Sequence, residues 1–364
     1  MIENNFLKEK LKNKVIDKKN FLWYPYSKMN RSFKTIGLVV VFYSITRLFY
    51  LIGEKMREEI LFTEQQIEQL KEKGLIIESI NNAREILKHF SSFDVIKVYE
   101  KLFMKDGRFK ENITIEKIFQ FYHYDRSIQN ILFKYTVYIE RVFKNKMASV
   151  ISKNLGVIKE EYLNIKNYIL RNDSEEIIRN VIEEINELSG DENPYILFKK
   201  VTFSKMTSLY DFLSEEIKEK IIPFNFLQAE KMEAKELFRN SLILIRKFRN
   251  EIAHSMNFVN YKSKRYVVFR YLKKVLNEHG YLKLTNKNDY SKYGRGSNDI
   301  FSMILVIILL LDNEFLRIEM LKELAFFIKN KDRERFNDFA KITNLPENFL
   351  ERINRVIDKK QKNN

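Results

Sequence analysis

Glycine and proline are scarce in this chain, and this scarcity constrains the fold more than any other feature of the sequence. The 364 residues include only nine glycines and four prolines. Sheets built from many short strands need such residues at their turns, whereas long helices need few of them. The sequence therefore predicts an all-α protein, and a hydrophobic content of 45% is enough to form one large core or two ordinary ones.

Cysteine and histidine usage limits the chemistry that is open to the chain. There are no cysteines and four histidines. A chain without cysteine has neither a disulfide framework nor a thiolate metal site, and these histidines lack the short spacings typical of metal ligands. We therefore expect no bound metal and no other cofactor.

The excess positive charge is concentrated in two segments. Residues 1–35 carry nine Lys/Arg against three acids and residues 261–295 carry ten against two, so they contribute +6 and +8 to the net charge of +16. Concentrated positive charge favours a polyanionic partner, and nucleic acid is the commonest soluble one.

In the second basic segment, aromatic residues alternate with the bases. Aromatic rings stack on unpaired bases while Lys and Arg hold phosphates, which favours RNA. The alternative is an ordinary solvated helix with an apolar side formed by Val267, Val268, Tyr271, Leu272 and Val275. The candidate RNA-binding residues are Lys262, Lys264, Arg265, Tyr266, Arg270, Tyr271, Lys273 and Lys274.

Changes in composition indicate five segments. Gly74 and Gly156 are expected to end helices, and residues 159–194 carry ten acids against four bases. We therefore expect a basic N-terminal extension, the first part of a helical domain, an acidic helical insertion, a helix with a candidate motif, and a basic and aromatic helical C-terminal region. These segments are residues 1–61, 62–157, 158–200, 201–260 and 261–364.

Two apolar stretches raise the question of membrane association. Ile36 to Gly53 is nearly long enough to span a bilayer but contains Arg47 near its middle, and Met303 to Asp312 is short. A charge at mid-span is costly, and a short apolar run is typical of a buried core helix. We expect a soluble cytoplasmic protein without stable membrane association.

The sequence "RKFRNEIAHSM" contains the candidate motif, Arg249, Asn250 and His254. At about 100° per residue, Asn250 shares a helix face with His254 whereas Arg249 lies about 140° away. One helix cannot close this arginine on its own histidine, so we expect a homodimer in which each arginine approaches the partner's histidine. Such a pocket suits RNA cleavage by the 2′-hydroxyl, with imidazole moving protons and guanidinium offsetting phosphate charge.

The same Arg-to-His spacing occurs a second time. "REILKH", Arg84 to His89, lacks the asparagine and lies in another predicted helix. Spacing alone is therefore weak evidence, and an ordinary histidine near a helix end remains an alternative for His254.

Four further segments follow one another along the chain: "LFTEQQIEQLKEKGLII", "FYHYDRSIQNILFKYTVYIERVFKNKMA", "VTFSKMTSLYDFL" and "RNEIAHSMNF". In this order they resemble the abortive-infection AbiD/AbiF family of the HEPN ribonuclease superfamily. The resemblance implies a HEPN-type helical bundle in which Arg249, Asn250 and His254 are catalytic. Asp125, Arg126 and Glu140 match the family's recurrent charged positions, and Glu140 is expected to orient Arg249.

The resemblance leaves two functions open. The first is a metal-independent endoribonuclease that acts as an abortive-infection toxin and associates with a small structured noncoding RNA. The second is an RNA-binding scaffold in which the Arg-Asn-His pocket grips phosphate without cleaving it. The same side chains serve either role, so the sequence does not separate them.

Overall fold

The computed structural model describes residues 63–362 except for 171–174, 189–192, 224–225, 227–230, 255–256 and 332. The chain divides into two compact units, Met1–Glu68 and Gln69–Asn364. In the first unit the described residues, 63–68, are helical. The basic extension 1–61 and the apolar stretch from Ile36 to Gly53 lie outside the described residues.

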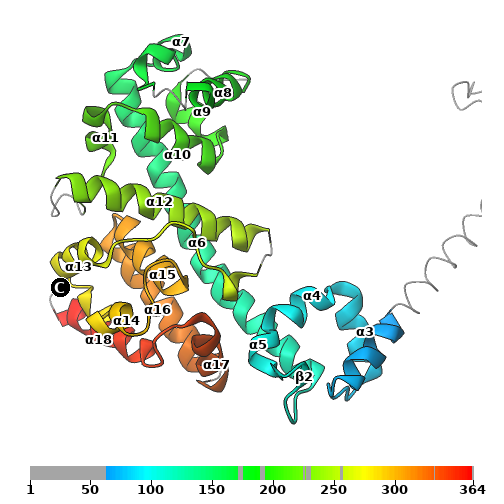
Figure 1. Cartoon of the computed structure of the whole chain (residues 1–364). Coiled ribbons are helices and arrows are strands. Elements are labelled where there is room, and N and C mark those ends of the chain that lie inside the picture. The colour runs from blue at the N-terminus through cyan, green and yellow to red at the C-terminus, as the bar shows by residue number, and fades with distance from the viewer. Residues whose placement is uncertain are drawn as a thin grey trace, which may run out of the picture. The chain divides into compact units, whose positions relative to one another are not determined.

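The second unit is built from helices, which confirms the all-α prediction (Figure 1). Its N-terminal helices are α3 (Ile80–His89), α4 (Ser92–Val95), η2 (Lys97–Tyr99) and α5 (Glu100–Phe103). A short antiparallel hairpin follows, with strands β1 (Met104–Lys105) and β2 (Arg108–Phe109). Gly74 has a φ of +90° and follows the helix that precedes α3, as expected for a glycine at a helix end.

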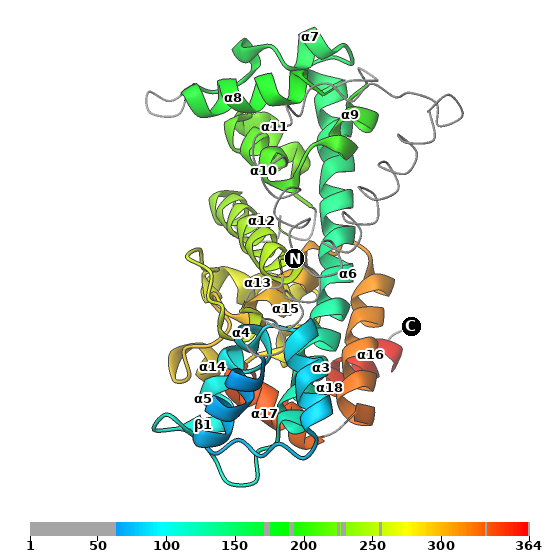
Figure 2. The same ribbon diagram turned by 90° about the vertical axis from the view of Figure 1, so that its right-hand side faces the viewer.

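Helix α6 (Ile115–Asn154) is the spine of this unit (Figure 2). Its 40 residues span about 60 Å at 1.5 Å per residue. Thr114 caps the first turn by accepting a hydrogen bond from the Lys117 amide at 3.1 Å. Gly156 follows the end of the helix with a φ of +109°, and a side chain there would collide with Glu161, so the predicted stop is confirmed.

The acidic segment forms short helices near the C-terminal end of α6. They are α7 (Lys159–Tyr162), η3 (Ile165–Asn167), α8 (Glu175–Asn186) and α9 (Pro194–Lys200). Helix α9 packs on α6, and α8 packs on α10 (Phe203–Phe212). Ile178 and Ile185 of α8 are fully buried, so this segment contributes to a core despite its charge.

Two helices complete the layer against α6. Helix α11 (Glu215–Ile221) and the 23-residue α12 (Lys231–Ala253) both pack against it, and α12 crosses it obliquely (Figure 1). The buried side of α12 recurs at helical spacing, as in Leu237, Phe238, Ile245 and Phe248. This packing fixes where the C-terminal end of α12 meets α6.

The C-terminal region surrounds one fully apolar helix, α15 (Ile300–Leu310), in which every residue is buried. Helix α15 contacts both α12 and α6, which confirms the prediction of a core helix at Met303 to Asp312. Within the described residues, no helix combines the length and apolarity that crossing a membrane requires. The other elements here are η5 (Phe258–Asn260), α13 (Phe269–Glu278), η6 (Leu282–Leu284), α14 (Lys287–Ser291), α16 (Glu314–Lys331), α17 (Arg333–Thr343) and α18 (Phe349–Lys362).

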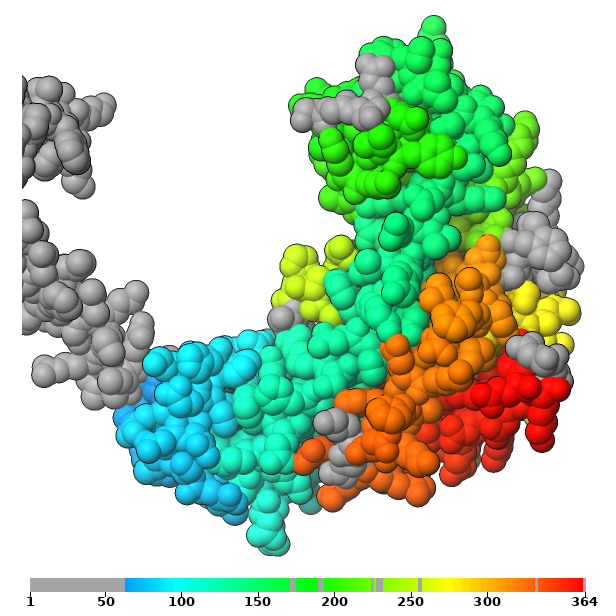
Figure 3. Space-filling view, turned by 180° about the vertical axis from the view of Figure 1, so that it is seen from behind, coloured from blue at the N-terminus to red at the C-terminus, as the bar shows by residue number. Residues whose placement is uncertain are grey.

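The last helices are held by polar contacts as well as by packing. Helix α16 lies along α6 (Figure 3) and also packs on α18. Arg352 of α18 forms a buried ion pair with Asp289 of α14, with Nη1 and Oδ2 2.5 Å apart. A buried pair of this kind joins two helices that are distant in sequence, and removing one partner would leave an uncompensated charge.

Candidate functional site

Arg249 lies near the C-terminal end of α12 and reaches across to α6. Its Nη2 is 3.6 Å from Oε2 of Glu140, its Nη1 donates to Oδ1 of Asn250 at 3.2 Å, and the guanidinium carbon lies 5.9 Å from the centre of the Phe133 ring. The Arg249 side chain is 32% exposed. The guanidinium is therefore held in place by α6 while part of it still faces solvent.

Glu140 is placed between two cations. Its side chain is only 13% exposed, and Oε1 lies 2.7 Å from Nζ of Lys144, one turn further along α6. A carboxylate buried to this degree is stable when it is paired. The structure thus brings Glu140 to Arg249 as the sequence suggested, and it adds Lys144 and Phe133, which sequence reasoning missed.

His254 follows directly after α12 and is exposed. Its backbone N–H donates to the Asn250 carbonyl at 3.0 Å, which continues the helical pattern for one more residue. Within the described part of the chain the imidazole accepts and donates no side-chain hydrogen bond. The Asn250 amide oxygen is bonded to Arg249, so this side chain positions the guanidinium and not the imidazole.

Glu251 lies three residues before His254 and is half-buried. Burial raises the pKa of the Glu251 carboxyl, and the nearby charges of Lys247 and His254 lower it in part. A carboxylate on this side of α12 is close enough to interact electrostatically with the imidazole. The open end of α12 therefore carries an arginine, a histidine and a carboxylate within two helical turns.

Asp125 and Arg126 lie elsewhere on α6. They are 15 and 14 residues before Glu140, which places them about 20 Å away along the helix. Asp125 is 1% exposed and accepts a hydrogen bond from the Tyr99 hydroxyl at 2.8 Å. Arg126 donates to Gln129 at 3.0 Å and lies over the Tyr122 ring. The structure therefore keeps this pair apart from the Arg249 cluster.

Burial governs the protonation of Asp125. Desolvation raises the pKa of its carboxyl to about 6, although hydrogen bonds from Gln129 and Tyr99 and the charge of Arg126 oppose this change. The pKa of the Tyr99 hydroxyl is also raised by its burial. Tyr99 had no signal in the sequence, since its contact with Asp125 spans 26 residues.

The second Arg-to-His spacing produces a different arrangement. On α3, Arg84 donates to Asn81 at 3.0 Å, and the His89 Nε2 lies 3.2 Å from Oε2 of Glu85. Both are local contacts on an exposed surface of one helix. These two bonds lie within α3 and do not involve a second helix.

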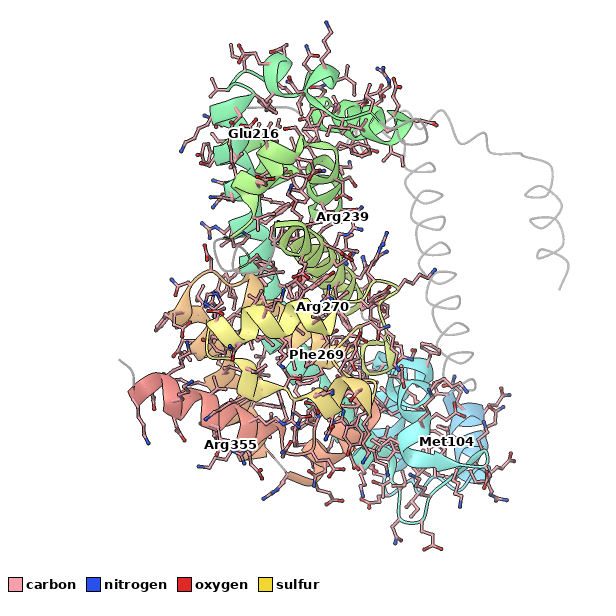
Figure 4. All side chains as sticks on the ribbon, turned by 60° about the vertical axis from the view of Figure 1, so that its left-hand side comes forward. Met104, Glu216, Arg239, Phe269, Arg270 and Arg355 are labelled. Carbon is pink, nitrogen blue, oxygen red and sulfur yellow. The ribbon has the colours of Figure 1, made fainter. Side chains whose placement is uncertain are left out.

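The basic residues of the C-terminal region fall into two groups. Arg270 and Lys274 of α13 both bind Glu233 of α12, at 3.0 and 2.8 Å, and Arg270 stands where α13 runs beside α12 (Figure 4). By contrast, Lys262, Lys264, Arg265, Tyr266 and Lys273 are exposed. The structure therefore leaves the second group available and engages the first in an interhelix ion pair.

The apolar side of α13 differs slightly from the expected one. The helix begins at Phe269, so Val268 precedes it, and both Val268 and Tyr271 are half-buried. Leu272, Val275 and Leu276 are fully buried and hold the helix. The guanidinium carbon of Arg270 lies 5.0 Å from the centre of the Tyr271 ring. Across the described residues, no group of three or more His, Asp or Glu side chains is arranged to hold a metal ion.

The match to a known family covers both α6 and α12, the helices that carry Glu140 and Arg249. Residues 85–260 match the family described as Abi-like protein. This region is just under half of the chain, and over it the chain is similar to Abi-like proteins. The matched region contains Glu140, Arg249 and His254, whereas the exposed bases from Lys262 onward lie beyond it. Searches among curated proteins and among solved structures found no match.

Proposed function

We propose that this protein is a metal-independent endoribonuclease of the HEPN type. The observation that carries the proposal is the contact of Arg249 with Glu140, beside the exposed His254. It combines a fixed, partly exposed guanidinium with an accessible imidazole at the end of one helix. A phosphodiester is the substrate that this pair suits, because one group offsets phosphate charge and the other transfers protons.

The reaction needs no group that the chain lacks. The imidazole of His254 takes the proton from the ribose 2′-hydroxyl as its oxygen attacks the adjacent phosphorus. The P–O5′ bond then breaks, the 5′-oxygen receives a proton, and the products carry a 2′,3′-cyclic phosphate and a 5′-hydroxyl. Arg249 stabilises the extra negative charge on the pentacoordinate phosphate. Glu140 and Asn250 position Arg249 and do not touch the substrate.

The complete site is proposed to form in a homodimer. Arg249 and His254 lie about 140° apart around α12, so each side chain is available to a group from a second copy.

In the cell we propose that the protein acts in the cytoplasm as an abortive-infection toxin, associated with a small structured noncoding RNA. The exposed bases Lys262, Lys264, Arg265 and Lys273 would contact RNA phosphates. Abortive infection requires that a toxic activity be restrained until infection. A bound RNA partner is a physical means of covering a cationic site until that time.

A non-catalytic RNA scaffold is the second candidate. It is favoured by the bonds of Arg249, which already engage Glu140 and Asn250, and by the absence of a described side-chain partner that fixes the His254 ring. Such a pocket would bind phosphate without the alignment that proton transfer needs.

One assay separates the two candidates. Purified protein is incubated with mixed RNA in EDTA, with His254→Ala protein alongside, and the product ends are analysed. We expect cleavage with 2′,3′-cyclic phosphate ends for the wild type and none for the variant. RNA that is retained but uncut by both proteins would assign the scaffold function instead.

A further inference from the structure

A cleft of about 450 Å³ opens beside the segment that follows the motif. Four lysines line it, and each comes from a different segment: Lys101 from α5, Lys110 after β2, Lys262 after η5, and Lys341 from α17. Helix α17 packs against both α5 and η5, which brings these segments together (Figure 2). The volume is within the range of ligand clefts, roughly 300–1,000 Å³.

The charges of the cleft are poorly balanced. Lys110 donates to the Leu102 carbonyl at 2.5 Å, but within the described residues Lys101, Lys262 and Lys341 have no ion-pair partner. Burial raises the pKa of the Asp338 carboxyl, one turn before Lys341 on α17, and the charges of Lys110 and Lys341 lower it in part. Several ammonium groups around one concave surface repel one another and attract an anion.

The acid on the cleft wall is already engaged. Asp299 is 3% exposed, and its carboxylate accepts hydrogen bonds from the backbone N–H groups of Gly296 at 3.0 Å and Ser302 at 2.9 Å. It caps α15 in this way. Its charge is therefore partly offset by the helix terminus, and the cleft keeps a net positive potential.

One wall of the cleft is joined to the proposed catalytic helix. The Tyr261 ring packs edge-on against Phe248 with ring centres 4.9 Å apart, and Phe248 directly precedes Arg249. The neighbouring Asn260 donates to the Val98 carbonyl at 2.8 Å, which fixes this wall to the N-terminal helices. An extended ligand that occupies the cleft therefore lies near the C-terminal end of α12.

A residue with an exposed aromatic ring, Tyr293, is bonded through its backbone to the lining of the cleft. Asn344 lines the cleft and donates to the Tyr293 carbonyl at 3.1 Å. The Tyr293 residue is 48% exposed, with the Arg295 guanidinium 4.5 Å and the Lys292 ammonium 5.3 Å from its ring centre. An open ring flanked by cations is a surface on which an unpaired base can stack.

We infer that the cleft of Lys101, Lys110, Lys262 and Lys341 binds the phosphates of a single-stranded RNA segment, with a base stacked on Tyr293. This inference deepens the proposed function, since it rests on RNA being the ligand. It assigns RNA contacts to α5 and α17, which lie outside the basic segment 261–295. The strand would run from Tyr293 through the cleft toward His254.

The test measures binding apart from cleavage. In a His254→Ala background, a fluorescein-labelled single-stranded RNA of mixed sequence is titrated at several salt concentrations. Lys101→Gln with Lys341→Gln should weaken binding roughly tenfold or more, and should lower the slope of log affinity against log salt by about 1.4, at ~0.7 per lost phosphate contact. The matched control is Lys153→Gln with Lys359→Gln, two exposed helical lysines away from the cleft.

Stacking is tested separately. Tyr293→Ala should weaken binding about 5- to 100-fold with an unchanged salt slope. Tyr195→Ala serves as control because Tyr195 is 42% exposed and lies beside the acidic segment. The melting temperature of each variant is measured first, and only variants that are as stable as the wild type are compared.

Each outcome decides one question. RNA binding that is lost equally in the Lys101/Lys341 and Lys153/Lys359 variants would overturn the cleft proposal and leave the proposed nuclease intact. No RNA binding by the His254→Ala protein would overturn both. Binding of inorganic triphosphate that requires Lys101 and Lys341, together with unchanged RNA affinity, would assign the cleft to a small phosphorylated ligand and contradict the RNA path.

Discussion

Helix α6 meets both Arg-to-His segments of the chain, and the two meetings differ in kind. Near its N-terminal end, Phe90 at the end of α3 packs on Phe119 with ring centres 5.1 Å apart, while Arg84 bonds to Asn81 and His89 to Glu85, both on α3 itself. Near its middle, Glu140 of α6 holds Arg249 of α12 directly. The same Arg-to-His spacing therefore gives local contacts on the surface of α3 and a polar contact between two helices at α12.

The two buried carboxylates of α6 differ in the same way. Glu140 lies between the cations of Arg249 and Lys144, whereas Asp125 accepts its hydrogen bond from a neutral tyrosine. Glu140 joins α6 to α12 through charged partners, whereas burial raises the pKa of the Asp125 carboxyl. Glu140 thus has the properties of a positioning group, and Asp125 those of a structural group.

The largest expected effect is on the two histidines. His254→Ala should lower RNA cleavage by about a thousandfold, since general acid–base catalysis contributes roughly 10²–10⁴-fold. His89→Ala should leave cleavage unchanged because the partner of the His89 ring among the described residues is Glu85, on the same helix. Cleavage rates in EDTA with a labelled RNA measure both. Equal loss in the two variants would mean that both segments build one intramolecular site.

The second-largest effect is expected when two inactive variants are combined in one dimer. Arg249→Ala and His254→Ala should each be inactive alone, but co-expressed chains with two different tags should recover roughly a quarter of wild-type activity. Half of randomly paired dimers are mixed, and each mixed dimer has one of two sites complete. Arg84→Ala paired with His89→Ala is the control and should be fully active throughout. A monomer in light scattering that cleaves at the full rate would contradict the dimeric site.

A smaller effect is expected from the carboxylate that holds Arg249. Glu140→Gln should reduce cleavage about fivefold, the equivalent of ~1 kcal/mol for a partly exposed ion pair, with little change in RNA affinity. Glu85→Gln removes the matching contact of His89 and should have no effect on either quantity. Single-turnover rates and anisotropy titrations measure the two quantities separately. An unchanged rate for Glu140→Gln would show that Arg249 keeps its position without α6.

The fold class and the core helix were predictable because they depend on local composition. The small number of glycines predicted the helices, and the uninterrupted apolar run at Met303 to Leu311 predicted the buried α15. The contact of Glu140 with Arg249 was anticipated from the family resemblance, since no local pattern joins residues 109 positions apart. The structure supplies the crossing of α6 and α12 that makes this contact.

Other contacts were not predictable because they depend on how distant helices pack. Glu233 pairs with both Arg270 and Lys274 only because α13 lies beside α12. The four cleft lysines are spread over 240 positions and gather through the packing of α17 on α5 and η5. Counting charges along the chain detects runs of bases, and it detects neither neutralised bases nor bases assembled by the fold.

The smallest effect on cleavage is expected for a substitution of Asp125, which should change the free energy of unfolding instead. The pKa of its carboxyl rises from 3.8 to about 6 on folding because the group is buried. Between these values the folded chain binds more protons than the unfolded chain, so this group lowers the free energy of unfolding as pH rises. The loss is complete above about 6 and absent below 3.8.

Asp125→Asn removes the ionisation while the amide oxygen can still accept the Tyr99 hydrogen bond. The free energy of unfolding of the variant minus that of the wild type should therefore rise across this pH window by up to ~3 kcal/mol, at about 1.4 kcal/mol per pKa unit. Urea denaturation at a series of pH values measures the difference, and cleavage should stay at the wild-type rate. A difference that stays flat with pH would mean that Asp125 ionises equally in both states. Its carboxylate would then need a partner stronger than Tyr99, and the contrast with Glu140 along α6 would disappear.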